Sequence, residues 1–336
     1  MIVLGIETSC DETSAALLND SAIISNIIST QQIHEQYGGV VPEFASRAHM
    51  TLLAPIVKEA LKEAQLTFAD IDGLAVTCGP GLAGSLLVGM CFCKGLATSL
   101  QKPFIGINHI EGHILAVNAQ SLPVEYPAIC LVASGGHTIL VYIKEPTQYK
   151  IIGRTIDDAA GEAFDKTAKI LGLGYPGGPA IEKNAKQGNE EAVNFPRALM
   201  DNDNFNFSFS GLKTSVLYYV ESLRKNNREI VIPDICASFQ KAVTDVLVEK
   251  SMRALREYNC NTLILAGGVA RNSSLRECFE KQCEINHKKF FVPAPELCTD
   301  NAAMIAKAGH IRLQKGEYSD FSLDVAPNLS LTDTIQ

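Results

Sequence analysis

The chain opens on an apolar run, IVLGI at residues 2–6, followed by a polar turn, ETSCDET at residues 7–13, and a second apolar run, AALL at residues 15–18. Short apolar runs bounded by turn residues are typical of buried strands. The stretch therefore predicts a strand, a polar turn and a second strand.

The same plan returns further along the chain. The apolar run ICLVA at residues 129–133 leads into the turn SGGHT at residues 134–138, and ILVYI follows at residues 139–143. The two stretches are not alike in sequence, but the repeated plan indicates two related halves. A chain of 336 residues is also long enough for about two domains.

Other periodic segments alternate between strand and helix, which predicts an α/β fold. Strands are expected at residues 73–78, 103–108 and 262–266. Helices are expected at residues 52–64, from the glycine turn at residues 79–84 to residue 100, and at residues 235–255 and 302–313. Thr299 and Asp300 are residue types that often cap a helix N-terminus, and they precede the last of these helices. Residues 190–212 are polar and irregular.

Composition limits the class of protein. Hydrophobic residues make up 46% and charged residues 20%, which is ordinary for a globular chain. The net charge is 29 − 37 = −8, so a nucleic-acid partner would have to be met by local basic patches or through another protein. The N-terminus does not resemble a signal peptide, and no uninterrupted apolar run approaches ~20 residues, so no membrane span is expected. Ten scattered cysteines without a CxxC pair indicate reduced, mostly buried thiols in the cytoplasm.

His109 and His113 are the first candidates for chemistry. They lie four residues apart in NHIEGHILA, and on a helix this spacing places both imidazoles on one face, where they can share a metal ion. Two unrelated surface histidines explain the spacing equally well. A zinc-protease helix requires HExxH, whereas the acid here is Glu111, which points to the opposite face.

A metal ion held by two histidines needs a third ligand, and Asp300 in CTDNAAMIA is a plausible carboxylate. Two His and one carboxylate suit Fe(II) and also Zn(II). On spacing alone, a helix cap is the better explanation of Asp300.

Two glycine turns follow predicted strands. Small residues at Ser134, Gly135 and Gly136 let backbone N–H groups approach a phosphate, and the stretch from Gly267 to Asn272 can pack against an adenine or a ribose. Each turn alone is weak evidence, but together with the first polar turn they are typical of a nucleotide site. In that first turn, Asp11 and Glu12 can hold a cation or accept a proton, or they can simply be a solvated acidic turn.

A third glycine stretch, GPGLAG at residues 79–84, matches GxGxxG. A dinucleotide site needs an acid about 20 residues later to bind the ribose, and residues 85–110 contain none. A dehydrogenase is therefore disfavoured, and we interpret these glycines as a tight turn with close helix packing.

The motifs taken together resemble one family, the bacterial tRNA N6-adenosine threonylcarbamoyltransferases of the TsaD type, formerly described as O-sialoglycoprotein endopeptidases. They occur in the family's order from residue 5 to about residue 308. The matching stretches are GIETSCDETS, GGVVPEFASRAH, GPGLAGSLLVG, HIEGH, ASGGHT, DDAAGEAFDKTAK, LGYPGGP, FSFSGLKT, AGGVARNS and CTDNAAMIA.

The resemblance implies the actin-like ATPase fold of sugar kinases and heat-shock ATPases, with two lobes around a nucleotide cleft. We expect residues 1–120 with 298–325 to form the first lobe and residues 125–297 the second, with a helical insertion around residues 155–230. The implied reaction transfers a threonylcarbamoyl group from threonylcarbamoyl-adenylate to N6 of adenosine 37, in tRNAs that read codons beginning with A, and releases AMP.

The resemblance also assigns residues. The family's metal ligands fall on His109, His113 and Asp300, with Fe(II) as the expected ion and Zn(II) as the alternative. Asp11 and Glu12 lie in the first phosphate turn, and a catalytic role for them is our own hypothesis. The family's donor-binding residues fall on Val132, Ala133, Ser134, Gly135, Gly136, Asp165, Gly178 and Asn272. Ala133 stands where many members have Val, and Arg271 where many have a small residue.

Members of this family work with an inactive paralogue of the same fold (TsaB type) and a small ATPase (TsaE type), so a heterodimer with the paralogue is expected. Two other functions remain open at this stage. One is a metalloprotease, against which the missing HExxH argues. The other is a non-catalytic nucleotide-binding subunit, which the missing basic surplus favours.

Overall fold

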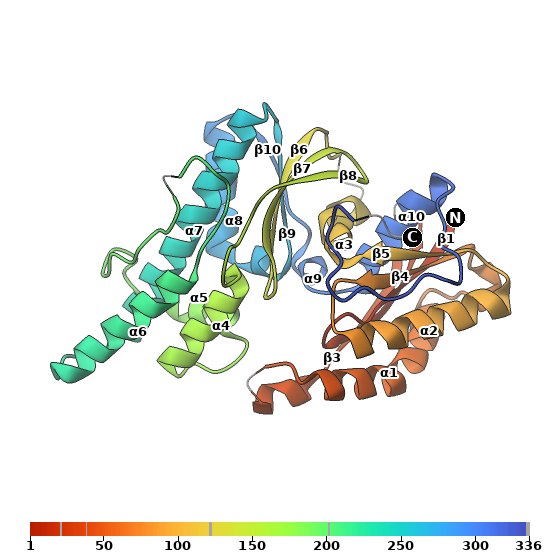
Figure 1. Cartoon of the computed structure of the whole chain (residues 1–336), viewed down its shortest axis with the longest axis horizontal. Coiled ribbons are helices and arrows are strands. Elements are labelled where there is room, and N and C mark those ends of the chain that lie inside the picture. Colours follow the sequence, from red (N-terminus) through yellow and green to blue (C-terminus); the bar gives the residue numbers. More distant parts are fainter. Residues whose placement is uncertain (21, 38, 121–122, 201, 334–336) are drawn as a thin grey trace. The chain divides into compact units, whose positions relative to one another are not determined.

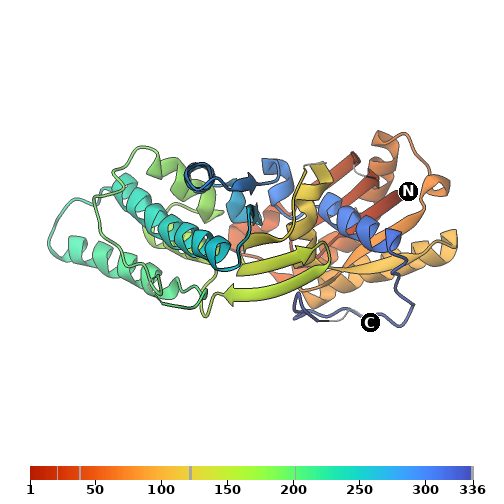
Figure 2. The same cartoon turned by 90° about the horizontal axis from the view of Figure 1, so that it is seen from above.

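The computed structural model describes residues 1–20, 22–37, 39–120, 123–200 and 202–333. The chain divides into two compact units (Figures 1 and 2). Unit 1 comprises Met1–Val124, Glu145–Tyr149 and Pro293–Gln336, and unit 2 comprises Glu125–Lys144 and Lys150–Val292.

Unit 1 is built on a five-stranded mixed sheet with the order β3-β2-β1-β4-β5. β1 pairs antiparallel with β2 and parallel with β4, and β4 pairs parallel with β5. The strands are β1 (Ile2–Glu7), β2 (Glu12–Asn19), β3 (Ala22–Thr30), β4 (Gly73–Gly79) and β5 (Phe104–Asn108). The long helices are α1 (Pro42–Glu63), α2 (Ala83–Leu100) and α10 (Ala302–Gln314), and the short ones are α3 (His109–Leu115) and α9 (Pro295–Cys298).

Successive side chains of a strand point to opposite faces of a sheet, and both faces of this sheet are covered by helices. Leu4 and Ile6 of β1 pack in one core with residues of α1 and α2. Val3 of β1 packs in the core on the other face, with residues of α10 (Figure 1).

Gly5 lets α10 lie directly on β1. A Cβ at this position would lie 2.3 Å from the carbonyl oxygen of Ala302 and 2.7 Å from the amide nitrogen of Ala306. No side chain fits in that space, so the glycine fixes how closely α10 approaches the strand. The start of α10 is thereby held beside the end of β1.

Unit 2 repeats the strand plan in a second five-stranded sheet, with the order β10-β9-β6-β7-β8. Its β6 pairs antiparallel with β7 and parallel with β9, as β1 does with β2 and β4. The strands are β6 (Ala128–Ala133), β7 (Thr138–Glu145), β8 (Gln148–Arg154), β9 (Thr262–Ala266) and β10 (Lys289–Phe291). The two sheets have equivalent strand orders, which confirms the two related halves.

The helices of unit 2 are α4 (Ala160–Leu171), α5 (Gly177–Ala185), α6 (Ser210–Lys225), α7 (Ile232–Glu257) and α8 (Ser273–Ile285). α6 lies inside the region around residues 155–230 where a helical insertion was expected, but no separate helix was predicted there, and its first residues overlap the segment 190–212 that the sequence indicated as irregular. The predicted start of α1 near residue 52 was wrong, because the helix begins at Pro42, where the fixed φ of proline suits a first turn.

Within the described residues, one helix, α2, is long and apolar enough to cross a membrane by length and composition. It packs on β4 and α1 as part of the folded layer of unit 1, and it gives no indication of a membrane protein. All ten cysteines lie in described parts of the chain, none of them is joined in a disulfide there, and seven of them are buried. The predicted reduced and mostly buried thiols are thus found.

Candidate metal centre and ligand-binding turns

Helix α3 begins at the carboxyl end of β5 and carries both candidate histidines. The side chain of Asn108 caps the helix by accepting a hydrogen bond from the amide of Ile110 at 2.9 Å. His109 is then the first helical residue and His113 lies one turn later. Their ring centroids are 4.7 Å apart. The two imidazoles therefore face the same region, as the spacing predicted.

Asp300 lies against both histidines. Its Oδ1 is 3.0 Å from Nε2 of His113 and 3.4 Å from Nε2 of His109. The alternative that Asp300 caps α10 is wrong, because Asn301 is the cap and accepts a hydrogen bond from the amide of Met304. The Asp300 carboxylate is therefore available to a ligand.

Burial strengthens the electrostatic interactions between the histidines and the carboxylates of this cluster. His109 and His113 are 8% and 1% exposed. Burial opposes the charged form of His109, but the carboxylates of Asp300 and Glu7 outweigh it and raise its pKa well above the usual range. Burial likewise opposes the ionised form of Asp300, but His109 outweighs it and holds the Asp300 pKa well below its usual range.

The donor set fits one divalent ion. The possible ligand atoms of His109, His113 and Asp300 all lie within 4.8 Å of one another. Two imidazoles and one carboxylate that leave open positions suit Fe(II) and Zn(II). The two Nε2 atoms converge on one carboxylate oxygen, so the same three groups can turn toward a common ion.

Glu7 and Ser9 also contact this cluster, although no role was predicted for either of them. Glu7 ends β1 and is fully buried, and its Oε2 lies 3.1 Å from Nδ1 of His109. The hydroxyl of Ser9 lies 3.1 Å from the same nitrogen. The available signal was an acidic residue at the end of a buried strand, where a carboxylate needs a specific partner.

Glu111, the acid between the two histidines, is committed elsewhere. Its Oε2 lies 2.9 Å from Nε of Arg312, and its Oε1 accepts a hydrogen bond from the hydroxyl of Tyr149. As the sequence predicted, it faces away from the histidine pair. It is therefore not placed as the general base of a zinc protease.

Asp11 lies in the turn that follows β1, and Glu12 is the first residue of β2, within the electrostatic reach of Asp11 and Asp300. Burial, reinforced by the carboxylates of Asp300 and Asp11, raises the pKa of Glu12 to about 10. In the metal-free protein Glu12 thus holds a proton at neutral pH. It becomes a base only when a cation or another positive charge lowers that pKa.

This raised pKa predicts a pH-dependent effect of Glu12→Gln. A carboxyl whose pKa is higher in the folded than in the unfolded chain stabilises the fold below about 4.5, the unfolded value, and that contribution is lost as pH rises toward 10. At pH 7 the variant should be more stable than the wild type by up to about 3 kcal/mol. Thermal unfolding in a chelator from pH 5 to pH 9 should show a gap in melting temperature that widens with pH. A gap that is constant or narrows would contradict this.

The glycine stretch at residues 79–84, which matches GxGxxG, packs against the first polar turn. The amide of Leu82 donates a hydrogen bond to the carbonyl of Ser9 at 2.8 Å, and a Cβ at Gly81 would lie 2.7 Å from the same oxygen. These contacts agree with our interpretation of a tight turn with close packing.

In unit 2, the predicted donor-binding residues lie on several elements: the stretch from Val132 to Gly136 spans the end of β6, Asn272 follows β9, Asp165 lies in α4 and Gly178 in α5. Val132 and Ala133 are buried and end β6. The carbonyl of Ser134 accepts a hydrogen bond from the amide of Gly161 in the first turn of α4. Ligands commonly bind at the carboxyl ends of parallel strands. The turn from Ser134 to Gly136 therefore lies between the end of β6 and the start of α4.

Gly135 and Gly136 are exposed at this turn, and the fold does not require a glycine at either position. A Cβ at each would meet nothing within 4 Å, and neither residue has a positive φ. Gly178, in the first turn of α5, is half-buried, but a Cβ there would likewise meet nothing within 4 Å and its φ is not positive. Their small size therefore leaves room beside the backbone for a ligand.

Asp165 and Asn272 also have structural roles. Asp165 accepts a hydrogen bond from the amide of Gly177 at 2.7 Å, so it holds the start of α5. Asn272 caps α8 through the amide of Leu275 and donates to the side chain of Gln240 at 2.7 Å. Each side chain can bind a ligand only through the donors and acceptors that these hydrogen bonds do not use.

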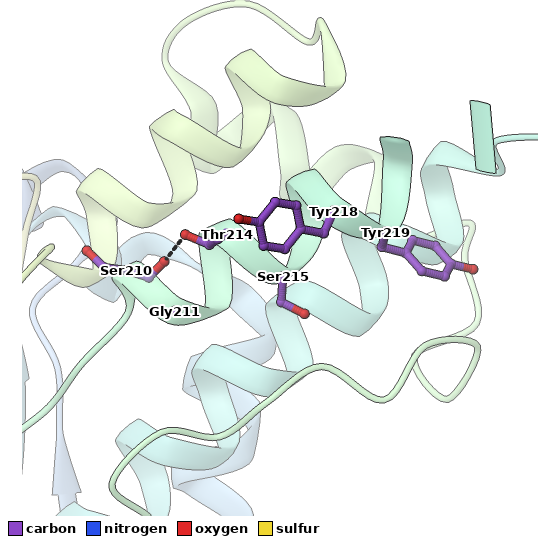
Figure 3. A pocket seen from close by; sticks show the side chains of 6 residues that line it. All are labelled: Ser210, Gly211, Thr214, Ser215, Tyr218 and Tyr219. Carbon is purple, nitrogen blue, oxygen red and sulfur yellow. Dashed lines mark hydrogen bonds between the residues drawn. The ribbon is translucent and has the colours of Figure 1, made fainter. Parts of the chain in front are cut away.

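A shallow pocket of about 630 Å³ lies apart from all of these residues, along one side of α6 (Figure 3). Thr214 donates to the carbonyl of Ser210 within it. The lining residues are Ser210, Gly211, Thr214, Ser215, Tyr218 and Tyr219. None of them carries a carboxylate, an imidazole or an amine, so the pocket offers no partner for metal-assisted transfer.

Comparison with known proteins identifies the family of the chain. Residues 22–307 match the family model described as TsaD, tRNA N6-adenosine threonylcarbamoyltransferase. The tRNA N6-adenosine threonylcarbamoyltransferase of Thermosipho africanus is 52% identical over 98% of this chain and 100% of its own length. That of Clostridium perfringens strain SM101 is 52% identical over 98% of each chain.

Solved structures show the fold. HypF from T. kodakarensis superposes with a TM-score of 0.63 over 94% of this chain and 48% of its own, at 14% identity. Component A of the (R)-2-hydroxyglutaryl-CoA dehydratase of Acidaminococcus fermentans superposes with a TM-score of 0.56 over 94% of this chain and 99% of its own, at 14% identity. The expected actin-like ATPase fold is confirmed, and the family match over most of the sequence leads to one conclusion. The chain is a transferase that belongs to the TsaD family of tRNA N6-adenosine threonylcarbamoyltransferases.

Proposed function

We propose that this chain transfers the threonylcarbamoyl group of threonylcarbamoyl-adenylate to N6 of adenosine 37, in tRNAs that read codons beginning with A. The N6 nitrogen attacks the carbamoyl carbon and forms a C–N bond. The bond from that carbon to the phosphate oxygen breaks, so AMP leaves with the electron pair, and the N6 proton passes to a base.

The observation that carries the proposal is the buried cluster of His109, His113 and Asp300, whose ligand atoms lie within 4.8 Å of one another. We propose that these residues hold one divalent ion, Fe(II) in preference to Zn(II). When bound, the ion supplies a Lewis acid that polarises carbamoyl or phosphate oxygens of the donor. The buried surroundings of both histidines strengthen that interaction.

We further propose that unit 2 binds the adenylate part of the donor. Backbone N–H groups at Gly135 and Gly136 suit the phosphate, and Asp165, Gly178 and Asn272 are proposed to contact the rest of the adenylate. The base is proposed to be Asp11 or Glu12. Since N6 is conjugated with the adenine ring and is a weak nucleophile, removal of its proton during attack assists the reaction.

The proposed donor site predicts that Gly136→Ala changes donor binding without changing stability. Because a Cβ there meets nothing in the protein, the melting temperature should remain within about 1 °C of the wild type, well under a 1 kcal/mol effect. The added methyl group occupies space that the donor needs, so KM for threonylcarbamoyl-adenylate should rise about tenfold, equivalent to about 1.4 kcal/mol. Gly211→Ala is the matched control, since its Cβ is equally unobstructed and it lies outside the proposed donor site. Unchanged KM in Gly136→Ala would contradict the placement of the donor.

AMP release tests the reaction against its two alternatives. Incubation with threonylcarbamoyl-adenylate should release AMP in proportion to added tRNA once partner proteins are present. A non-catalytic subunit would bind the nucleotide and be stabilised by it without tRNA-dependent AMP release. A metalloprotease would cleave a protein substrate, and the ion pair of Glu111 with Arg312 leaves it without the acid of HExxH.

We propose three partners: tRNA, an inactive paralogue of the TsaB type in a heterodimer, and a small ATPase of the TsaE type. We also propose a cytoplasmic location. A net charge of −8 argues that tRNA is met through local basic patches or through a partner's surface.

A further inference from the structure

We propose that Glu7 is a positioning residue for the metal centre, and that its carboxylate holds His109 in the one tautomer and orientation that can bind the ion. This rests on the metal centre proposed above and adds a residue outside the three ligands. The relevant atoms are Oε2 of Glu7 and Nδ1 of His109, which lie 3.1 Å apart.

The contact assigns the ring nitrogens. An ionised carboxylate only accepts hydrogen bonds, so the bond to Oε2 places a proton on Nδ1 of His109. A neutral imidazole protonated at Nδ1 has its free lone pair on Nε2. That is the nitrogen that faces Oδ1 of Asp300, at 3.4 Å. Glu7 therefore directs the nitrogen that binds metal toward the other ligands.

Glu7 is itself held rigidly from two sides. Its Oε1 accepts a hydrogen bond from the amide of Ser9 at 2.5 Å, and its Oε2 accepts one from the hydroxyl of Thr77 at 2.6 Å. Thr77 lies on β4, the neighbouring strand of the sheet. The sheet thus fixes the carboxylate, and the carboxylate fixes the imidazole.

The three bonds explain why the residue is an acid. Ser9, Thr77 and His109 present three donors to the two oxygens of Glu7. A glutamine has one acceptor oxygen and one NH2 group, so its NH2 must face at least one of these donors. A fully buried carboxylate is costly unless it is hydrogen-bonded, and here Nδ1–H of His109 completes its set of donors. Ligating histidines commonly depend on such a carboxylate at the second ring nitrogen.

The test compares Glu7→Gln with Thr77→Val in the full chain. Thr77→Val removes one hydrogen bond to Glu7 and leaves His109 untouched, so it reports the cost of disturbing the carboxylate alone. Zinc affinity is measured by competition with a chelator, and the melting temperature of the metal-free protein is measured in parallel. Glu7→Gln should lower zinc affinity about 10- to 100-fold, and Thr77→Val by less than about threefold.

The outcomes are distinguishable. If the wild type binds zinc and Glu7→Gln binds it equally well, the positioning role is overturned while the metal centre stands. If the wild type binds no zinc, Fe(II) or other divalent ion, the metal centre itself fails. If both variants lose zinc affinity in step with their melting temperatures, Glu7 has only a structural role.

A measurement on the wild type covers the case in which Glu7→Gln does not fold. Nitrogen-15 labelling of histidine in the zinc-loaded protein reports which ring nitrogen of His109 carries the proton. The proposal requires a proton on Nδ1 and zinc on Nε2. A proton on Nε2 would overturn it.

Discussion

Replacing His109 by alanine is expected to remove the bound metal and to abolish transfer. The substitution leaves His113 and Asp300 as two ligands, and a structural or catalytic site of this kind needs at least three from the protein. Metal content should fall from about one ion per chain to less than about one-tenth. Because a Lewis acid contributes several kcal/mol to such a step, the transfer rate should fall at least about a hundredfold.

The matched control is His287→Asn, which replaces an exposed histidine that is not one of the proposed ligands. Asparagine tolerates the positive φ of that position. It should keep metal content and rate at wild-type levels. Metal analysis and single-turnover rates on the same preparations decide the matter. Full metal occupancy together with normal turnover in His109→Ala would refute the assignment of this ligand.

Gly5→Ala is expected to have the largest effect on stability. Its new Cβ would lie 2.3 Å from the carbonyl oxygen of Ala302, and backbone cannot yield as a flexible side chain can. We expect the free energy of unfolding to fall by at least about 3 kcal/mol as α10 is pushed away from β1. Since Asp300 lies two residues before Ala302, metal affinity should fall as well.

Gly95→Ala provides the comparison. This glycine lies inside α2, and a Cβ there meets nothing within 4 Å. Alanine should therefore stabilise the protein by about 0.5–1 kcal/mol through helix propensity. Chemical denaturation of both variants, with metal titrations, checks the pair. Equal stability of Gly5→Ala and the wild type would show that α10 does not depend on this close approach.

The central strands and the repeated plan could be predicted because each is a local pattern, whereas β3, β8 and β10 at or near the sheet edges were not predicted. The apolar runs at residues 2–6 and 129–133 are bounded by turn residues, and each became a central strand of its sheet. The spacing of His109 and His113 placed them correctly on one side of a helix for the same reason. The start of α1 was missed and the bounds of α6 were not predicted, since their sequences are less clearly periodic.

The rest of the site could not be predicted because it depends on contacts between distant residues. From spacing alone Asp300 was better explained as a cap, and only the fold shows that Asn301 caps α10 while Asp300 meets His113. Glu7 lies 102 residues before His109, and no local pattern links an acid at a strand end to that ring. The family resemblance identified Asp300 as a metal ligand, and only the three-dimensional contacts revealed the role of Glu7 beside His109.

The central claim is that this chain, with its metal ion, modifies N6 of an adenosine in tRNA. The most direct measurement is mass analysis of tRNA nucleosides after incubation with threonylcarbamoyl-adenylate and the metal-loaded chain, with and without partner proteins. We predict N6-threonylcarbamoyladenosine at position 37, formed with the partners present and lost when the metal is chelated. Unmodified adenosine under every condition, with metal, donor and partners all present, would contradict the claim.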